Sequence, residues 1–334
     1  EATMLLDEFF FPRVLIVSGK GGVGKTTVAA SLALSAARTG KKVCVVEIDQ
    51  KGSLTAIFGR GNVGYEPSEI FPDVWAISVA AEEALIEYLD VQYHMKRISR
   101  AFTGVHFIDY ITTAAPGLKD ILVLGKIWYL ERGRAGGVSR QDFDLIIVDA
   151  PAAGHMLTFL SAPAGLSDAV RVGPIRRQAE WLLEMLQDPA RTRAHLVTLA
   201  EEMPVSETLE TAVALRERVG IKVGTIFANG IYPETFSPKE EELLKDIRSD
   251  GSLDELLAEA QRTNINLDSD DLEAFVGYAD FLSARRQIQT AHLEQLRAEA
   301  AEPVIELPFV FAAKIGLPEL EELADAIEEL VAKL

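Results

Sequence analysis

The chain has 334 residues, 48% hydrophobic and 25% charged, which is typical of one large or two ordinary globular domains and excludes a disordered or low-complexity chain. Asp and Glu outnumber Lys and Arg by 51 to 33, a formal net charge of −18, so the surface repels nucleic-acid phosphates and anionic lipid headgroups. With a single cysteine, Cys44, the chain has no disulfide framework, no cysteine-based zinc site of its own and no iron–sulfur cluster.

Short apolar runs bounded by turn residues predict strands. They cover residues 14–18, 43–48, 74–79, 143–148, 195–199, 223–228 and 304–307. These runs are apolar on both faces, and long helical segments separate them. The pattern therefore predicts a doubly wound α/β fold, with a mainly parallel sheet between two layers of helices.

Three stretches lack strand signals and are typical of helices. Residues 81–132 and 164–190 predict insertions that form a helical subdomain, and residues 238–300 predict an acidic helical excursion. A final amphipathic helix starts at Pro318. Since Lys333 is its one basic residue, we expect it to pack against the sheet and not to bind a membrane.

A glycine-rich loop follows the first strand and matches the pattern G-x-x-x-x-G-K-[ST] in residues 19–27. Backbone N–H groups of such a loop converge on the β-phosphate, Lys25 neutralises the β and γ oxygens, and the Thr26 hydroxyl coordinates Mg²⁺. We expect these residues to bind nucleotide: Gly21, Gly22, Val23, Gly24, Lys25, Thr26 and Thr27.

Two carboxylates follow predicted strands. Asp49 ends the second strand, where it either orients or deprotonates the attacking water or caps a helix at residues 54–58. Asp149 ends a later apolar strand in the Walker B arrangement. We expect Thr26, Asp49 and Asp149 to form the metal site. The Gly154 amide can approach a γ-phosphate, which makes it a candidate sensor of ATP against ADP.

Residues 20–27, KGGVGKTT, resemble the deviant Walker A motif of the SIMIBI class of P-loop NTPases. Members of that class are typically nucleotide-dependent dimers. The resemblance implies that Lys20 is a catalytic residue, together with Asp49 and Lys25, and that it reaches the partner's nucleotide. The alternative is a solvated surface lysine.

Further segments resemble the ArsA family, which contains arsenite-pump ATPases and tail-anchored-protein targeting ATPases. They are DAPAAGHMLTFL (149–160), APGLKDILVLGK (115–126), EEMPVSET (201–208), FAN (227–229) and LP (307–308). The paired ArsA-like ATPases of actinobacteria are especially similar. The resemblance implies that Asn229 contacts adenine, Glu201 lies near the nucleotide and Pro308 belongs to a loop over the base. Alternatively, Asn229 is a turn residue before Gly230, and Glu201 is a helix-start charge.

The resemblance implies Mg²⁺-dependent ATP hydrolysis at the interface of a homodimer, or of a heterodimer with a related ATPase, as a switch for a protein partner or cargo. The alternatives are a slow or non-hydrolysing scaffold subunit and a targeting chaperone for tail-anchored membrane proteins. Cys44 alone supplies neither a zinc clasp nor arsenite thiolates. Without a signal peptide or an apolar run of spanning length, we expect one cytoplasmic P-loop ATPase domain over residues 1–334 that inserts in no membrane.

Overall fold

The structure is a computed structural model that describes residues 2–48, 52–93, 117–133, 142–170, 172–237, 239–240, 242, 253–263, 265 and 268–334. Its strands form one eight-stranded sheet in the order β3-β4-β2-β5-β1-β6-β7-β8. Neighbouring strands are parallel except for β3 and β4. The predicted doubly wound, mainly parallel sheet is confirmed. The strands are β1 Val14–Gly19, β2 Val43–Ile48, β3 Ser68–Phe71, β4 Val74–Val79, β5 Leu145–Asp149, β6 Thr192–Leu199, β7 Val223–Ile231 and β8 Val304–Pro308.

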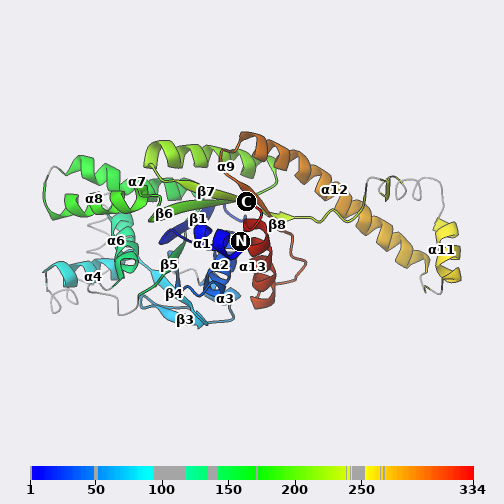
Figure 1. The fold of residues 1–334 in the computed structure, drawn as a ribbon, viewed down its shortest axis with the longest axis horizontal. Coiled ribbons are helices and arrows are strands. Elements are labelled where there is room, and N and C mark those ends of the chain that lie inside the picture. The colour runs from blue at the N-terminus through cyan, green and yellow to red at the C-terminus, as the bar shows by residue number, and fades with distance from the viewer. Residues whose placement is uncertain are drawn as a thin grey trace.

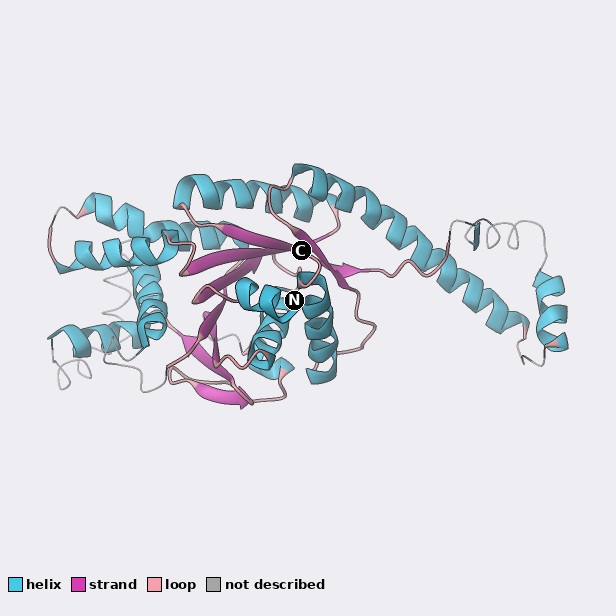
Figure 2. Ribbon diagram, in the orientation of Figure 1, coloured by secondary structure: helices cyan, strands magenta, loops and turns pink. Residues whose placement is uncertain are grey.

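Helices cover both faces of this sheet (Figures 1 and 2). The described helices are α1 Ala2–Phe9, α2 Lys25–Arg38, α3 Ser53–Ile57, α4 Ala81–Tyr93, α6 Leu118–Arg132, α7 Ala153–Ala169, α8 Pro174–Gln187, α9 Glu202–Ala214, α11 Leu253–Arg262, α12 Ser269–Glu299 and α13 Leu317–Val331, with a π-helical turn η2 Leu215–Val219 after α9.

The core lies in two layers because alternate strand residues point to opposite faces. On β1, Val14 and Ile16 pack with residues of α6, α7, α8 and α9. Leu15 and Val17 pack on the other face with residues of α1, α2 and α13. All residues of β1 and β2 are buried. Burial on both faces explains why these strands are continuous apolar runs.

Several elements differ from the sequence-based expectation. The antiparallel edge strand β3 was not predicted, because it has four residues and only Ile70 is buried. Helix α1 was not predicted either. Helix α7 starts at Ala153, so the helical stretch expected from residue 164 is the second half of a helix that begins directly after β5. Residues 94–116, within the first expected insertion, lie outside the described part of the chain.

Helix α12 is one 31-residue helix that runs outward from the body of the protein towards α11 (Figure 1). It begins with a capping box, in which the Asp271 amide donates to Asp268 Oδ1 at 2.8 Å. Of its apolar residues, Leu272, Val276, Ala279 and Leu282 are buried, whereas Phe275 is 53% exposed. The helix therefore leaves part of its apolar surface in solvent.

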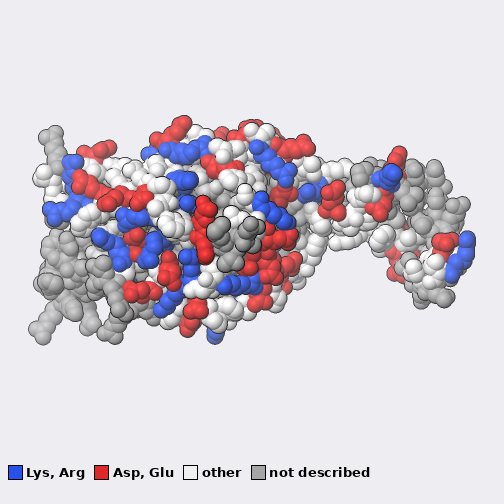
Figure 3. Space-filling model, in the orientation of Figure 1, with Lys and Arg blue, Asp and Glu red and all other residues white. Residues whose placement is uncertain are grey.

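Helix α13 packs its apolar face against the sheet, as predicted. Leu320, Leu323, Ala324, Ile327 and Val331 are buried in the same core layer as α2. Asp and Glu side chains are grouped over this helix (Figure 3). None of the helices within the described ranges combines the length and the apolar character that crossing a bilayer requires.

Candidate nucleotide-binding site

The glycine-rich loop connects β1 to α2 near the centre of the sheet, where strand order reverses. Gly24 caps α2 with a φ of 92°. A Cβ at this position would overlap the Asn229 Nδ2, so the turn requires glycine. Lys25 Nζ donates to the Lys20 carbonyl oxygen at 2.9 Å and thereby holds the loop closed. Backbone N–H groups at the start of α2 make this loop a suitable anion site.

The Thr26 hydroxyl and the Asp149 carboxylate lie together at the start of α2. Thr26 Oγ1 donates to Asp149 Oδ2 at 2.7 Å. Val17 of β1 pairs with Asp149 in the strand register, and the Ala150 amide donates to the Val17 carbonyl at 3.0 Å. The paired strands thus fix the carboxylate beside the loop. A hydroxyl and a carboxylate are the hard oxygen donors that fit Mg²⁺.

Asp49 lies outside the described residues, so its predicted role stays a prediction. Sequence reasoning missed another carboxylate, Glu47, which pairs with Asp149 in the register of β2 and β5. Glu47 of β2 is 3% exposed and accepts hydrogen bonds from the Ser53 amide at 2.9 Å and the Ser53 hydroxyl at 3.1 Å. It therefore ties the start of α3 to the end of β2.

A cavity of about 500 Å³ opens at the carboxyl ends of β6, β7 and β8, and we call it the strand-end cavity. It brings together these predicted site residues: Gly22, Val23, Gly24, Thr27, Glu201, Asn229 and Pro308. Asn229 Nδ2 donates to the Val23 carbonyl at 2.9 Å, which connects the end of β7 to the glycine-rich loop. The cavity therefore continues from the predicted phosphate site to the residues that the resemblance assigns to the base.

The strand-end cavity also has walls that sequence reasoning did not identify. Tyr232 stacks on Phe309 with ring centroids 4.5 Å apart, and both line the cavity. Arg285, Ile288 and Gln289 of α12 line it as well. No local motif marks the three α12 residues, because α12 reaches the cavity only through the tertiary fold.

Lys20 lies at the start of the loop and forms an ion pair within the same chain. Its Nζ is 2.6 Å from Glu207 Oε1 of α9, and the side chains are 35% and 40% exposed. The sequence predicts either a contact with the partner's nucleotide or a solvated surface lysine, and neither interpretation includes Glu207. The contact connects the glycine-rich loop to α9.

Several predicted site residues lie outside the cavity lining, and they are Lys20, Gly21, Lys25, Thr26, Asp149 and Gly154. Gly21 has no atom within 4 Å of a Cβ built on it, and the same holds for Gly154 in the first turn of α7. Both backbones therefore border open space.

Cys44 is fully buried in β2, and burial raises the pKa of its thiol to about 12. Its thiol stays protonated at neutral pH and is a poor ligand for a soft ion.

Comparison with known proteins assigns the family. The profile described as "Anion-transporting ATPase" matches residues 12–182. The chain is 31% identical to "ATPase BagA" of Mycobacterium tuberculosis over 332 residues, which cover 95% of this chain and 93% of that protein. It is 28% identical to the "Putative arsenical pump-driving ATPase" of Halobacterium salinarum over 243 residues, 67% of this chain but only 36% of that protein. Since the family profile matches residues 12–182, more than half of the chain, and the BagA match covers 95% of it, the chain belongs to the ArsA family of anion-transporting ATPases.

Proposed function

We propose that this ATPase hydrolyses Mg²⁺·ATP between two facing protomers and uses the loss of the γ-phosphate to switch an interaction with a protein partner or cargo. The observation that carries the proposal is the continuity of the strand-end cavity, which runs from Gly24 to Asn229 and Pro308. A nucleotide placed there has its phosphates at the start of α2 and its base at the ends of β7 and β8.

Each polar residue of the site has a role in this proposal. Lys25 and the loop amides hold the β and γ oxygens, Thr26 and Asp149 supply ligands to Mg²⁺, and Asp49 orients the attacking water and lies near the metal. Mg²⁺, when bound, neutralises phosphate charge. Asn229 uses its Nδ2 for the Val23 carbonyl. Its Oδ1 would therefore accept a hydrogen bond from the 6-amino group of adenine and repel the O6 of guanine.

The dimer completes the site through Lys20. We propose that this lysine leaves Glu207 and contacts the phosphates bound by the facing protomer, so that hydrolysis depends on association. The Lys20–Glu207 pair is partly exposed. Such pairs are weak, and a phosphate with several negative charges competes well for the lysine.

The helical subdomain is our candidate for the partner-facing element, within a single P-loop domain. Trp128 of α6 stacks on Trp181 of α8 with ring centroids 5.2 Å apart, and Lys126 of α6 forms a 2.9 Å ion pair with Glu87 of α4. These contacts support a unit of α4, α6 and α8. Trp181 is 37% exposed, and Val172, just before α8, is 83% exposed. In this proposal a protein partner covers these apolar side chains and removes them from water.

The catalytic part is tested by measuring ATP hydrolysis of the wild type, Lys25→Ala and Asp49→Asn with Mg²⁺, with Lys41→Ala as a surface-lysine control. We expect hydrolysis in the wild type and the control only. Equal rates in all four proteins would contradict the residue assignment.

The dimer is tested by measuring molar mass in solution with ADP and with a non-hydrolysable ATP analogue. We expect the analogue to shift wild type to twice the mass, and Lys20→Ala to stay at the mass of one chain. A wild-type chain that stays monomeric alone but pairs with a related ATPase would identify a heterodimer. Absence of hydrolysis in that complex would favour the scaffold alternative.

A further inference from the structure

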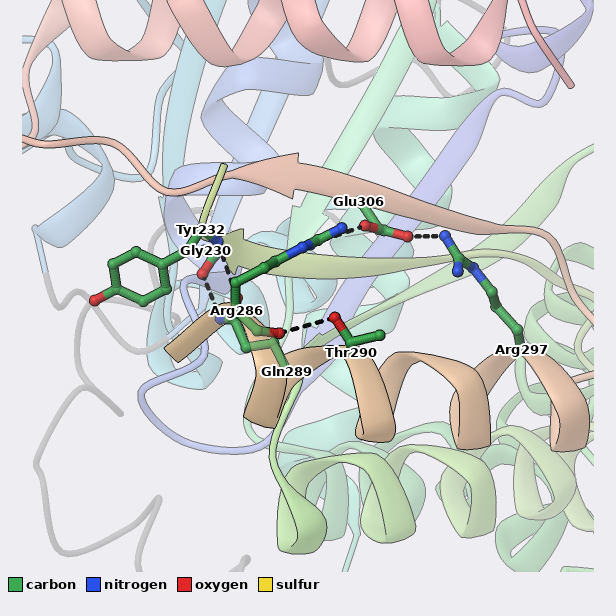
Figure 4. A network of polar contacts seen from close by, with 7 residues as sticks. All are labelled: Gly230, Tyr232, Arg286, Gln289, Thr290, Arg297 and Glu306. Atoms are coloured by element: carbon green, nitrogen blue, oxygen red, sulfur yellow. Dashed lines mark hydrogen bonds and ion pairs between the residues drawn. The ribbon is translucent and has the colours of Figure 1, made fainter. Parts of the chain in front are cut away.

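Helix α12 is hydrogen-bonded to the backbone that directly follows Asn229. Gln289 Nε2 donates to the Gly230 carbonyl at 2.8 Å, and Gln289 Oε1 accepts from the Tyr232 amide at 2.9 Å (Figure 4). Gly230 has a φ of 70° within β7, where the pairing with β8 shifts register, so the strand bulges at this point. One side chain of α12 therefore holds the backbone on both sides of Ile231, directly after Asn229.

The same part of α12 is also attached to β8. Arg286 and Arg297 both form ion pairs with the carboxylate of Glu306, and the Arg286 contact measures 3.5 Å (Figure 4). Glu306 lies two residues before Pro308 in β8. Helix α12 is thus fixed to the two strands whose ends carry Asn229 and Pro308.

Side chains of α12 form part of the wall of the strand-end cavity. Arg285 and Ile288 line it together with Gln289. Ile288 is 56% exposed, and the Arg285 guanidinium lies 5.5 Å from the ring centroid of Phe281. An exposed apolar side chain beside a planar cation suits a flat aromatic ligand, because a base covers the first and stacks on the second.

We propose that α12 forms the outer wall of the base end of the nucleotide site, where Arg285 contacts the bound base and Gln289 is a positioning residue for Asn229. This inference rests on the proposed function and identifies two residues that determine nucleotide affinity and base selectivity. It assigns a role at the site to the acidic helical excursion, which no phosphate-loop or strand-end motif includes.

The two residues act differently on binding. Loss of the Gln289 hydrogen bonds frees the β7 bulge at Gly230 and misplaces Asn229, so it weakens recognition of adenine more than recognition of guanine. Loss of Arg285 removes a stacking contact that every purine makes, so it weakens both nucleotides to a similar extent. A purely structural role for α12 does not produce this difference.

The experiment is calorimetric titration of the full chain with Mg²⁺·ATP and with Mg²⁺·GTP. The variants are Gln289→Met, which keeps the length of the side chain but removes both hydrogen bonds, and Arg285→Ala. The matched controls are Gln295→Met on the same helix and Arg262→Ala on α11, neither of which lines the cavity.

We expect Gln289→Met to weaken ATP binding about tenfold, the effect of one well-placed hydrogen bond, and to lower the ratio of ATP to GTP affinity. Arg285→Ala should weaken both nucleotides about threefold, as expected for an exposed cation–π contact. The controls should bind as the wild type does.

Wild-type affinities in both variants would overturn the inference. Equal weakening of ATP and GTP by Gln289→Met would overturn the positioning role. If Gln289→Met does not fold, Arg285→Ala still decides whether α12 contacts the ligand, because Arg285 is exposed. A wild type that binds neither nucleotide overturns the proposed function itself, which is a different result.

Discussion

The Thr26 hydroxyl donates a 2.7 Å hydrogen bond to Asp149 Oδ2 and so joins the first turn of α2 to the end of β5. This contact places two hard oxygen donors side by side. We predict that Thr26→Ala lowers kcat for ATP about a hundredfold or more, because a metal ligand is lost and charge at the phosphates is less well neutralised. The measurement is the hydrolysis rate as a function of Mg²⁺ concentration.

Thr26→Ser is the matched control, because it keeps the hydroxyl and removes only a methyl group. We expect its Mg²⁺ dependence to stay within a few-fold of the wild type. If Thr26→Ala needs no more Mg²⁺ than the wild type does, Thr26 is not a metal ligand.

Gly24 and Asn229 lie so close that no side chain fits between them. We predict that Gly24→Ala lowers the free energy of unfolding by about 1–3 kcal/mol, since alanine at a φ of 92° is strained and its Cβ would overlap Asn229 Nδ2. Urea unfolding without nucleotide measures this change. Gly21→Ala, which borders open space, should change the unfolding free energy by about 0.5 kcal/mol at most.

A double variant separates backbone strain from the clash. Asn229→Ala removes the overlapping group, so the cost of Gly24→Ala should be smaller in that background. If Gly24→Ala lowers the unfolding free energy equally in the wild-type and in the Asn229→Ala background, the overlap with Asn229 does not contribute to that loss.

The sequence predicts the parts of the fold and of the site that depend on local patterns. The buried strands are continuous apolar runs, and the glycine-rich loop, Thr26 and Asp149 lie where a strand ends, so each has a signal within a few residues. Glu47 has no such signal, because its structural role depends on its burial and on the hydrogen bond that it accepts from the Ser53 amide.

Long-range contacts explain what remained unpredicted. Gln289 reaches Gly230 across 59 residues, and Lys20 reaches Glu207 across 187 residues. Neither glutamine nor glutamate at these positions differs from an ordinary helical surface residue in the sequence. Only the packing of α12 and α9 against the strand ends makes them part of the site.

His195 makes stability depend on pH. It is buried in β6 beside Phe9 and Phe227, and burial, with the charge of Arg193 as a second cause, lowers its pKa from 6.5 to about 3. Between these values the unfolded chain binds a proton that the folded chain does not, so acid favours unfolding. We predict that this residue costs about 1.4 kcal/mol of unfolding free energy for each pH unit between 6.5 and about 3.

The measurement is urea unfolding of the wild type and of His195→Leu at about pH 7 and about pH 5. The wild type should lose more stability than the variant over this interval, because leucine binds no proton. His292→Gln, a half-exposed position on α12, should keep the wild-type dependence. Parallel curves for the wild type and His195→Leu would contradict the prediction.

Glu207 holds Lys20 within its own chain at 2.6 Å, and in our proposal this contact competes with the contact across the dimer. We predict that Glu207→Gln raises the hydrolysis rate about two- to fivefold at low protein concentration, since a partly exposed ion pair contributes little free energy. Lys20→Met should abolish the dependence of the rate on protein concentration. Glu210→Gln on the exposed side of α9 is the matched control and should leave the rate unchanged. If Glu207→Gln instead slows hydrolysis to the level of Lys20→Met, the ion pair is a functional contact of the active dimer and not a competitor.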